Sequence, residues 1–129
     1  MDIQNKTLPA TERLVLLVKN PNKIFVFWQW DKVKTNNFQN KDFKEDIILK
    51  FYYAQERSFA CEKVLSWDKF KEYMDIPQKG KDYYAIMYAQ NSSGEIIQLM
   101  ESNTITMPGP ESREIKDTYA SGFFKKVVK

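Results

Sequence analysis

Residues 13–30, RLVLLVKNPNKIFVFWQW, decide the fold of this 129-residue chain. They contain two short apolar runs, residues 14–18 and 24–30, separated by the turn sequence Asn20-Pro21-Asn22. Short runs rich in β-branched and aromatic residues around a turn predict two consecutive strands. The second run is apolar at both sets of alternating positions, with isoleucine, valine and tryptophan on one face and phenylalanine on the other. We therefore expect this strand to lie deep in a sheet that is covered on both faces.

The same strand-like composition recurs until about residue 108. Four further strands are predicted, at residues 47–54, 58–65, 82–90 and 95–100. The tight-turn sequence Asn91-Ser92-Ser93-Gly94 joins the last two into an antiparallel hairpin. Residues 102–108 continue the sheet edge until Pro108-Gly109-Pro110 ends it, because proline cannot donate to a strand ladder. About seven short strands with turns between them predict an all-β, immunoglobulin-like antiparallel sandwich.

Two segments between the strands are less regular. Residues 31–46 are rich in Asn, Asp and Lys and predict a long surface connection, with a helical turn as an open alternative. In residues 66–75 the spacing of the apolar residues favours a short helical insertion with Ser66 as its cap, and a strand is the alternative. The apolar residues with this spacing are Trp67, Phe70, Tyr73 and Met74.

The chain divides into three parts by composition. We expect an N-terminal arm over residues 1–12, a β-sandwich domain over residues 13–110 and a polar, basic tail over residues 111–129. The tail ends in FFKKVVK, and a C-terminal helix is an open alternative for it. A chain of this length, with 43% hydrophobic and 15% aromatic residues, has the material for one core.

The chain contains no histidine, and Cys61 is its one cysteine. Histidine is the usual general acid or base near neutral pH, the commonest zinc ligand, and the partner of serine or cysteine nucleophiles. A lone cysteine forms neither an intramolecular disulfide nor a multi-cysteine metal site, and we expect a buried, unreactive thiol. The sequence therefore predicts a protein that is not an enzyme and has no catalytic, metal or cofactor site.

The net charge of the chain bears on the partners it can bind, and its N-terminal sequence bears on its location in the cell. The net charge of +3 comes from 20 basic residues, of which only Arg13, Arg57 and Arg113 are arginines. Arginine suits bidentate recognition of phosphates and bases, so we expect nucleic-acid binding to be weak or absent. The N-terminus has no basic segment followed by an apolar one, and no run reaches the length that spans a bilayer. We therefore expect a cytoplasmic protein without a membrane span.

One part of the pattern resembles fibronectin type III domains. The residues that carry the resemblance are Trp28 in an early strand, the Ile76-Pro77 and Gly80 corner, and the strand that begins at Tyr83-Tyr84. In that family a tyrosine hydroxyl bonds back to the corner backbone. The resemblance implies this role for Tyr83 or Tyr84, because a buried phenol needs a partner.

The chain also resembles an uncharacterised bacterial family, a domain of unknown function of the 4900 series. The family pattern is LPxxY, then RLVLLVRDP, a YW pair, a glycine-containing hairpin and SNxVxTP. The matching residues here are Leu8-Pro9, 13–21, Phe27-Trp28, Gly94 and 102–108.

This chain departs from that family pattern at three places. Lys19-Asn20 replaces Arg-Asp, Phe27 replaces tyrosine, and Thr106-Met107-Pro108 replaces Thr-Pro. The resemblance implies no reaction for the family or for this chain.

Candidate binding residues come from the aromatic and polar positions near strand ends. Trp30 lies next to Asp31 at a strand end, so we expect it to be more exposed than Trp28, and Trp67 is a second candidate for stacking. Ser102 and Asn103 follow the last hairpin, where their side chains either meet a ligand or bond local backbone. Arg13 either pairs with an acidic neighbour or covers the first strand. The expected core residues are Trp28, Phe27 and Tyr84.

The sequence thus predicts a non-catalytic binding module that acts through a protein partner or self-association. Two alternatives remain open. Trp30 and Trp67 could form a stacking surface for carbohydrate, which would show as coplanar exposed rings. Lysines around residues 31–46 could serve a weakly nucleic-acid-associated accessory domain, which would show as a continuous basic stripe with interleaved aromatics.

Overall fold

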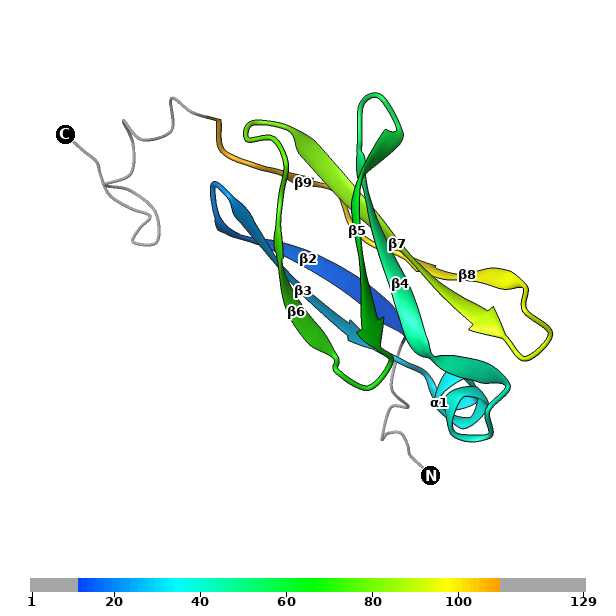
Figure 1. Cartoon of the computed structure of the whole chain (residues 1–129). Helices are drawn as coiled ribbons and strands as arrows, with labels where there is room; N and C mark the ends of the chain where they lie inside the picture. The colour runs from blue at the N-terminus through cyan, green and yellow to red at the C-terminus, as the bar shows by residue number, and fades with distance from the viewer. Residues whose placement is uncertain (1–11, 110–129) are drawn as a thin grey trace.

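Two antiparallel sheets pack face to face in the computed structural model, which describes residues 12–109 (Figure 1). The smaller sheet has the strand order β2-β3-β6 and the larger has the order β5-β4-β7-β8, with β9 also paired to β7. The smaller sheet consists of β2 (Arg13–Asn20), β3 (Lys23–Gln29) and β6 (Lys71–Asp75). The larger consists of β4 (Phe43–Tyr53), β5 (Ser58–Ser66), β7 (Asp82–Asn91), β8 (Ile96–Glu101) and β9 (Ile105–Thr106). The predicted all-β antiparallel sandwich is confirmed.

The two consecutive strands predicted in residues 13–30 form a hairpin with each other, and the hairpin predicted around residues 91–94 is confirmed. In the first, β2 pairs with β3 around the Asn20–Asn22 turn, where the Asn22 amide donates to Asn20 Oδ1 at 2.9 Å. In the second, β7 pairs with β8, and Asn91 Oδ1 accepts from the amides of Ser93 and Glu95. Gly94 has a φ of 93°, which glycine adopts without strain.

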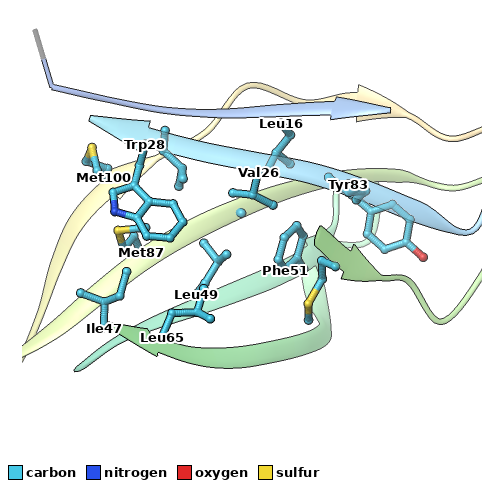
Figure 2. Close-up of a cluster of buried hydrophobic side chains, with 14 of the residues drawn as sticks. Leu16, Val26, Trp28, Ile47, Leu49, Phe51, Leu65, Tyr83, Met87 and Met100 are labelled. Atoms are coloured by element: carbon cyan, nitrogen blue, oxygen red, sulfur yellow. The ribbon is translucent and has the colours of Figure 1, made fainter. Parts of the chain in front are cut away.

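The core lies between the two sheets, as Figure 2 shows. Because side chains alternate along a strand, each sheet turns one set of apolar residues inward. The smaller sheet contributes Leu16, Val26 and Trp28, and the expected core position of Trp28 is confirmed at 2% exposure. The larger sheet contributes the fully buried side chains of Ile47, Leu49, Phe51, Tyr83 and Met87.

Two residues expected in the core lie on outer faces. Phe27 is half-buried on the outer face of β3, so the expectations that Phe27 is a core residue and that β3 is covered on both faces are wrong. Within residues 12–109 this face is open to solvent, since Leu17 and Tyr73 on either side of Phe25 are 49% and 48% exposed. Tyr84 is buried, but on the outer side of β7, where its ring stacks on Tyr52.

The helix lies in the segment that we expected to be a surface connection. Helix α1 (Lys32–Gln39) begins after Asp31, whose side chain accepts from the Lys34 amide at 2.8 Å. This side-chain cap satisfies one of the free amides of the first turn. The helix lies beside the start of β4 (Figure 1) and buries Phe38 to 2% exposure.

The helical insertion favoured at residues 66–75 is wrong, and the strand alternative is correct. Phe70 has a φ of 69°, a left-handed conformation that a helix interior does not allow, and its carbonyl accepts from the Trp28 amide at 2.9 Å. The chain then continues as β6, which pairs with β3. Met74 faces the core and Tyr73 faces outward, so the spacing that resembled a helix face is the alternation of a short strand.

The tyrosine corner implied by the fibronectin resemblance is present and uses Tyr83. Its hydroxyl donates to the Gln78 carbonyl at 2.7 Å and accepts from the Gln78 amide at 3.1 Å. Burial raises the pKa of Tyr83 to about 12. The hydroxyl therefore remains protonated at neutral pH and pins the loop before β7 to the sheet.

Several predictions fall on residues that the structure does not describe. These are the N-terminal arm up to residue 11 and the C-terminal tail with its helix alternative, so the domain boundaries stay predictions. Over residues 12–109, no helix has the length and apolar character that crossing a membrane requires.

Candidate functional site

The two tryptophans proposed for stacking are part of a packed corner. The indole nitrogens of Trp28 and Trp30 both donate to the Trp67 carbonyl, at 3.0 and 2.9 Å. Trp30 is 4% exposed and Trp28 2%, so both rings are buried and the expectation that Trp30 is exposed is wrong. Trp67 is half-buried and its ring stacks on Phe38 with centroids 5.0 Å apart. Trp30 and Trp67 therefore do not form a coplanar exposed platform.

Ser102 and Asn103 bond to backbone between β8 and β9. The Asn103 side chain accepts from the Leu16 amide at 2.8 Å and donates to the Leu16 carbonyl at 3.1 Å, which ties the larger sheet to β2. Ser102 Oγ accepts from the Ala85 amide at 2.8 Å and donates to the Asn103 carbonyl at 2.7 Å. These side chains therefore bond to backbone groups that have no backbone partner from a neighbouring strand there.

Arg13 leads to a different surface. Its guanidinium lies over the ring of Phe27, 5.7 Å from the ring centroid, on the outer face of the smaller sheet. It thus covers a ring of β3, whereas the predicted alternatives were an acidic partner or cover of the first strand. Of the five candidate binding residues, Arg13 is the one that lies on an exposed apolar sheet face.

We call this surface the cationic aromatic face. The strand pairing places Val15 opposite Phe27, Leu17 opposite Phe25, and Phe25 opposite Tyr73, so their side chains share one side of the sheet. Leu17 is 49% exposed and Tyr73 48% exposed. The face consists of Arg13, Val15, Leu17 and Lys19 on β2, Phe25 and Phe27 on β3, and Lys71 and Tyr73 on β6.

The rings of the face pack on one another at tilted angles. The Phe25 centroid lies 5.1 Å from that of Tyr73 and 5.9 Å from that of Phe27, with interplanar angles of 47° and 34°. Lys19 Nζ lies 5.9 Å from the Tyr73 centroid. Cations over aromatic faces are attracted to the negative ring surface, by about 0.5–1 kcal/mol at exposed sites. Phe27 and Tyr73 thus each have a positive charge over the ring.

The charge of the face is one-sided. Among the described residues, no ion pair involves Arg13, Lys19 or Lys71. The acid that shares their side of the sheet, Asp75, is bonded to Lys23 at 2.6 Å, and that contact lowers the pKa of Asp75. The face therefore presents three cations without an acidic partner in the part of the chain that is described.

The opposite outer face, on the larger sheet, has a different character. Tyr52 and Tyr84 stack with centroids 5.3 Å apart, and the Tyr52 and Tyr88 hydroxyls lie 3.2 Å from each other. Its charges are mixed, since Lys50 stands opposite Glu62 in the strand register. We call it the tyrosine face; it also has a shallow open depression lined by Lys44, Glu45, Asp46, Ile48, Val64 and Gln90.

Residues 12–109 contain no cluster of three or more acidic or cysteine side chains that could hold a metal ion. Cys61 is half-buried, and burial raises its pKa to about 11, so its thiol is protonated at neutral pH. The cationic aromatic face offers apolar contact area and fixed positive charge, and both suit the binding of a ligand.

Most of the cationic aromatic face was not predicted from the sequence. The alternation in residues 24–30 was recognised, but its outward phenylalanines were expected to be covered. The same period of two in β2 places Arg13, Val15, Leu17 and Lys19 on one side, and this signal was available. Tyr73 and Lys71 could be added only once residues 71–75 were known to be a strand.

Comparisons with solved structures show the fold. The fibronectin type III domain of human collagen XX has a TM-score of 0.55 at 12% identity, over 82% of this chain and 98% of that one. The FN5 domain of Drosophila Lar has a TM-score of 0.50 at 12% identity, over 79% of this chain and 99% of that one. A computationally redesigned β-sandwich protein has a TM-score of 0.55 at 13% identity, over 80% and 97%. The chain is thus a fibronectin type III-like sandwich, as predicted.

A comparison with protein families gives the membership of the chain. The family model described as "Domain of unknown function (DUF4912)" matches residues 10–117. No curated protein matches the chain. The chain belongs to the DUF4912 family, and the predicted resemblance to a 4900-series family is confirmed.

Proposed function

We propose that this DUF4912 chain is a non-catalytic, cytoplasmic module that binds another protein through its cationic aromatic face. The single observation that carries the proposal is the composition of that face, with exposed and half-buried apolar side chains at its centre and cations around them. Exposed apolar patches with a polar rim are typical of protein interaction sites. Tyrosine, phenylalanine and arginine are also the residue types enriched in such interfaces.

Protein is favoured over carbohydrate by the geometry of the rings. A sugar stacks on an open ring face, whereas Phe25 tilts against both Phe27 and Tyr73. Arg13 also lies over Phe27, and Lys19 lies over Tyr73. Leu17 and Val15 add aliphatic surface that suits apolar side chains of a partner.

Site-specific photo-crosslinking in the cells that naturally produce the protein tests this proposal. The photoreactive residue p-benzoylphenylalanine would replace Tyr73 on the cationic aromatic face or, as the matched control, Val64 on the tyrosine face, which is 57% exposed. We expect a discrete adduct at position 73 that protease destroys and nuclease leaves intact, at least tenfold more abundant than any adduct at position 64.

Three results would contradict the proposal. Equal adducts at positions 64 and 73 would mean that the face has no special role. A nuclease-sensitive adduct at position 73 would mean that the partner is a nucleic acid and not a protein. The absence of any adduct at position 73 would mean that the cationic aromatic face is not the binding surface.

A further inference from the structure

We infer that the partner segment which docks on the cationic aromatic face is acidic and apolar, with carboxylates at both ends of an extended stretch. This inference rests on the proposed function and adds the chemistry of the partner. It follows from the charges of the face, their spacing and what lies between them.

Charge complementarity selects the sign of the partner. Arg13, Lys19 and Lys71 have no acidic partner in the described part of the chain, and Asp75 is already bonded to Lys23. The acid on the other side of β6, Glu72, contacts Lys63 and Lys69 and does not reach the face. A ligand that brings carboxylates therefore gains three charge-assisted contacts, whereas a basic ligand is repelled.

The spacing of the cations indicates an extended ligand. Arg13 and Lys19 stand near the two ends of β2, six residues apart in sequence. At about 3.3 Å per residue, this separates them by about 20 Å. An extended segment spans that distance with about six residues, so carboxylates near its two ends would reach both cations while the residues between them contact the apolar strip.

The strip between the cations supplies the apolar contacts. Leu17 and Tyr73 are each about half exposed, at 49% and 48%, and flank the half-buried ring of Phe25. Apolar side chains of the partner would cover this strip and remove it from water. Acidic residues alone would therefore bind more weakly than acidic residues mixed with aromatic ones.

The same charges argue against two occupants from this chain itself. A second copy that met this face with its own would oppose three cations to three cations, which is repulsive. The C-terminal tail of residues 111–129 has five basic residues against three acidic ones, and it ends in the basic, apolar sequence FFKKVVK. Neither occupant is complementary in charge.

Nucleic acid shares the negative charge but fits the rings less well. Base stacking needs an accessible ring face. Here Arg13 lies over Phe27 and Lys19 over Tyr73, and adjacent rings are tilted by 34° to 47°. The face also has one arginine and two lysines, so bidentate phosphate contacts are limited to one residue.

Binding of random copolymers by the full chain tests the inference. The probes are poly(Glu,Tyr), poly(Glu), poly(Lys,Tyr) and a single-stranded oligo(dT), each titrated into the labelled protein while fluorescence anisotropy is followed. We expect poly(Glu,Tyr) to bind at least fivefold more tightly than poly(Glu), and no binding of poly(Lys,Tyr). Oligo(dT) should bind more weakly than poly(Glu,Tyr).

Charge reversal locates the binding. The triple variant Arg13→Glu, Lys19→Glu and Lys71→Glu should lose at least tenfold in affinity for poly(Glu,Tyr). The matched control reverses three cations away from the face, Lys44→Glu and Lys50→Glu on β4 and Arg57→Glu in the turn between β4 and β5, and should change the affinity less than threefold. Thermal melts followed by circular dichroism check that both triple variants remain folded. If the Arg13, Lys19 and Lys71 variant unfolds, the single variant Lys71→Glu replaces it and should lose about threefold in affinity for poly(Glu,Tyr).

The outcomes separate this inference from the proposed function. Equal losses in the two triple variants, tighter binding of oligo(dT), or no binding of poly(Glu,Tyr) would each overturn the acidic-partner inference. If crosslinking at position 73 still captured a protein, the binding module would stand and only the partner's chemistry would be wrong. If crosslinking at position 73 failed as well, both the proposed binding function and the acidic-partner inference would be wrong.

Discussion

Replacing Trp28 with alanine should lower the free energy of unfolding by about 3–5 kcal/mol, the usual cost of truncating a large buried aromatic side chain. Trp28 is 2% exposed and its ring lies between the two sheets (Figure 2). Its indole nitrogen shares the Trp67 carbonyl with Trp30, so that carbonyl keeps one donor when Trp28 is removed. Most of the loss should therefore come from packing. Urea unfolding followed by circular dichroism measures it.

Trp30→Ala should cost nearly as much as Trp28→Ala. The sequence indicated a smaller loss, because it placed Trp30 at an exposed strand end, whereas the ring is 4% exposed and contacts Phe38 at 4.9 Å between centroids. The control is Phe59→Ala, at a side chain that is 53% exposed, which should change stability by at most about 0.5 kcal/mol. Small losses of stability for both tryptophan variants would show that Trp28 and Trp30 are not packed in the core as described.

Phe38→Ala should also lower the free energy of unfolding by about 3–5 kcal/mol. Phe38 is the buried residue of α1, and its ring contacts Trp30, Phe43 and Trp67 at centroid distances of 4.9, 5.2 and 5.0 Å. Removing it leaves a cavity between the helix and the end of the sandwich. Urea unfolding gives the magnitude, and amide hydrogen exchange in residues 32–39 should rise because the helix loses its contact with the core.

A matched substitution on the same helix separates packing from helix propensity. Val33 is 64% exposed, and Val33→Ala should leave stability unchanged or raise it slightly, since alanine is the better helix former. If Phe38→Ala were as mild as Val33→Ala, the helix would not be docked through Phe38.

The parts of the fold that were predictable are those specified by neighbours in sequence. The β2-β3 and β7-β8 hairpins each combine alternating apolar residues with a turn rich in asparagine, and both the strands and their pairing follow from that local pattern. The tyrosine corner was predictable to within one residue, because Tyr83 and Tyr84 are adjacent and only the sheet face decides between them.

The errors arose where distant contacts decide the structure. The polar sequence of residues 32–39 has little helical pattern, yet Phe38 docks on Trp30 and on the distant Trp67. Asp31 caps the start of the helix. Residues 71–75 become a strand because β3 offers a free edge, which cannot be read from the segment alone.

The binding surface was harder to predict than the fold, since it needs strands from two separate segments to lie side by side. Arg13 was a candidate binding residue in the sequence, but Leu17, Phe25 and Tyr73 join it on one face only through the β2-β3-β6 order. Trp30, Ser102 and Asn103 were chosen for their residue types, and the structure uses their polar atoms in hydrogen bonds to backbone.

Amide NMR spectra of the ¹⁵N-labelled full chain, recorded as poly(Glu,Tyr) is added, locate the binding surface most directly. The largest shifts or losses of signal should fall on β2, β3 and β6, at Val15, Leu17, Phe25, Phe27 and Tyr73, with little change in β4 and β7. Changes centred on the tyrosine face, or spread evenly over both sheets, would contradict the assignment of the cationic aromatic face as the binding surface.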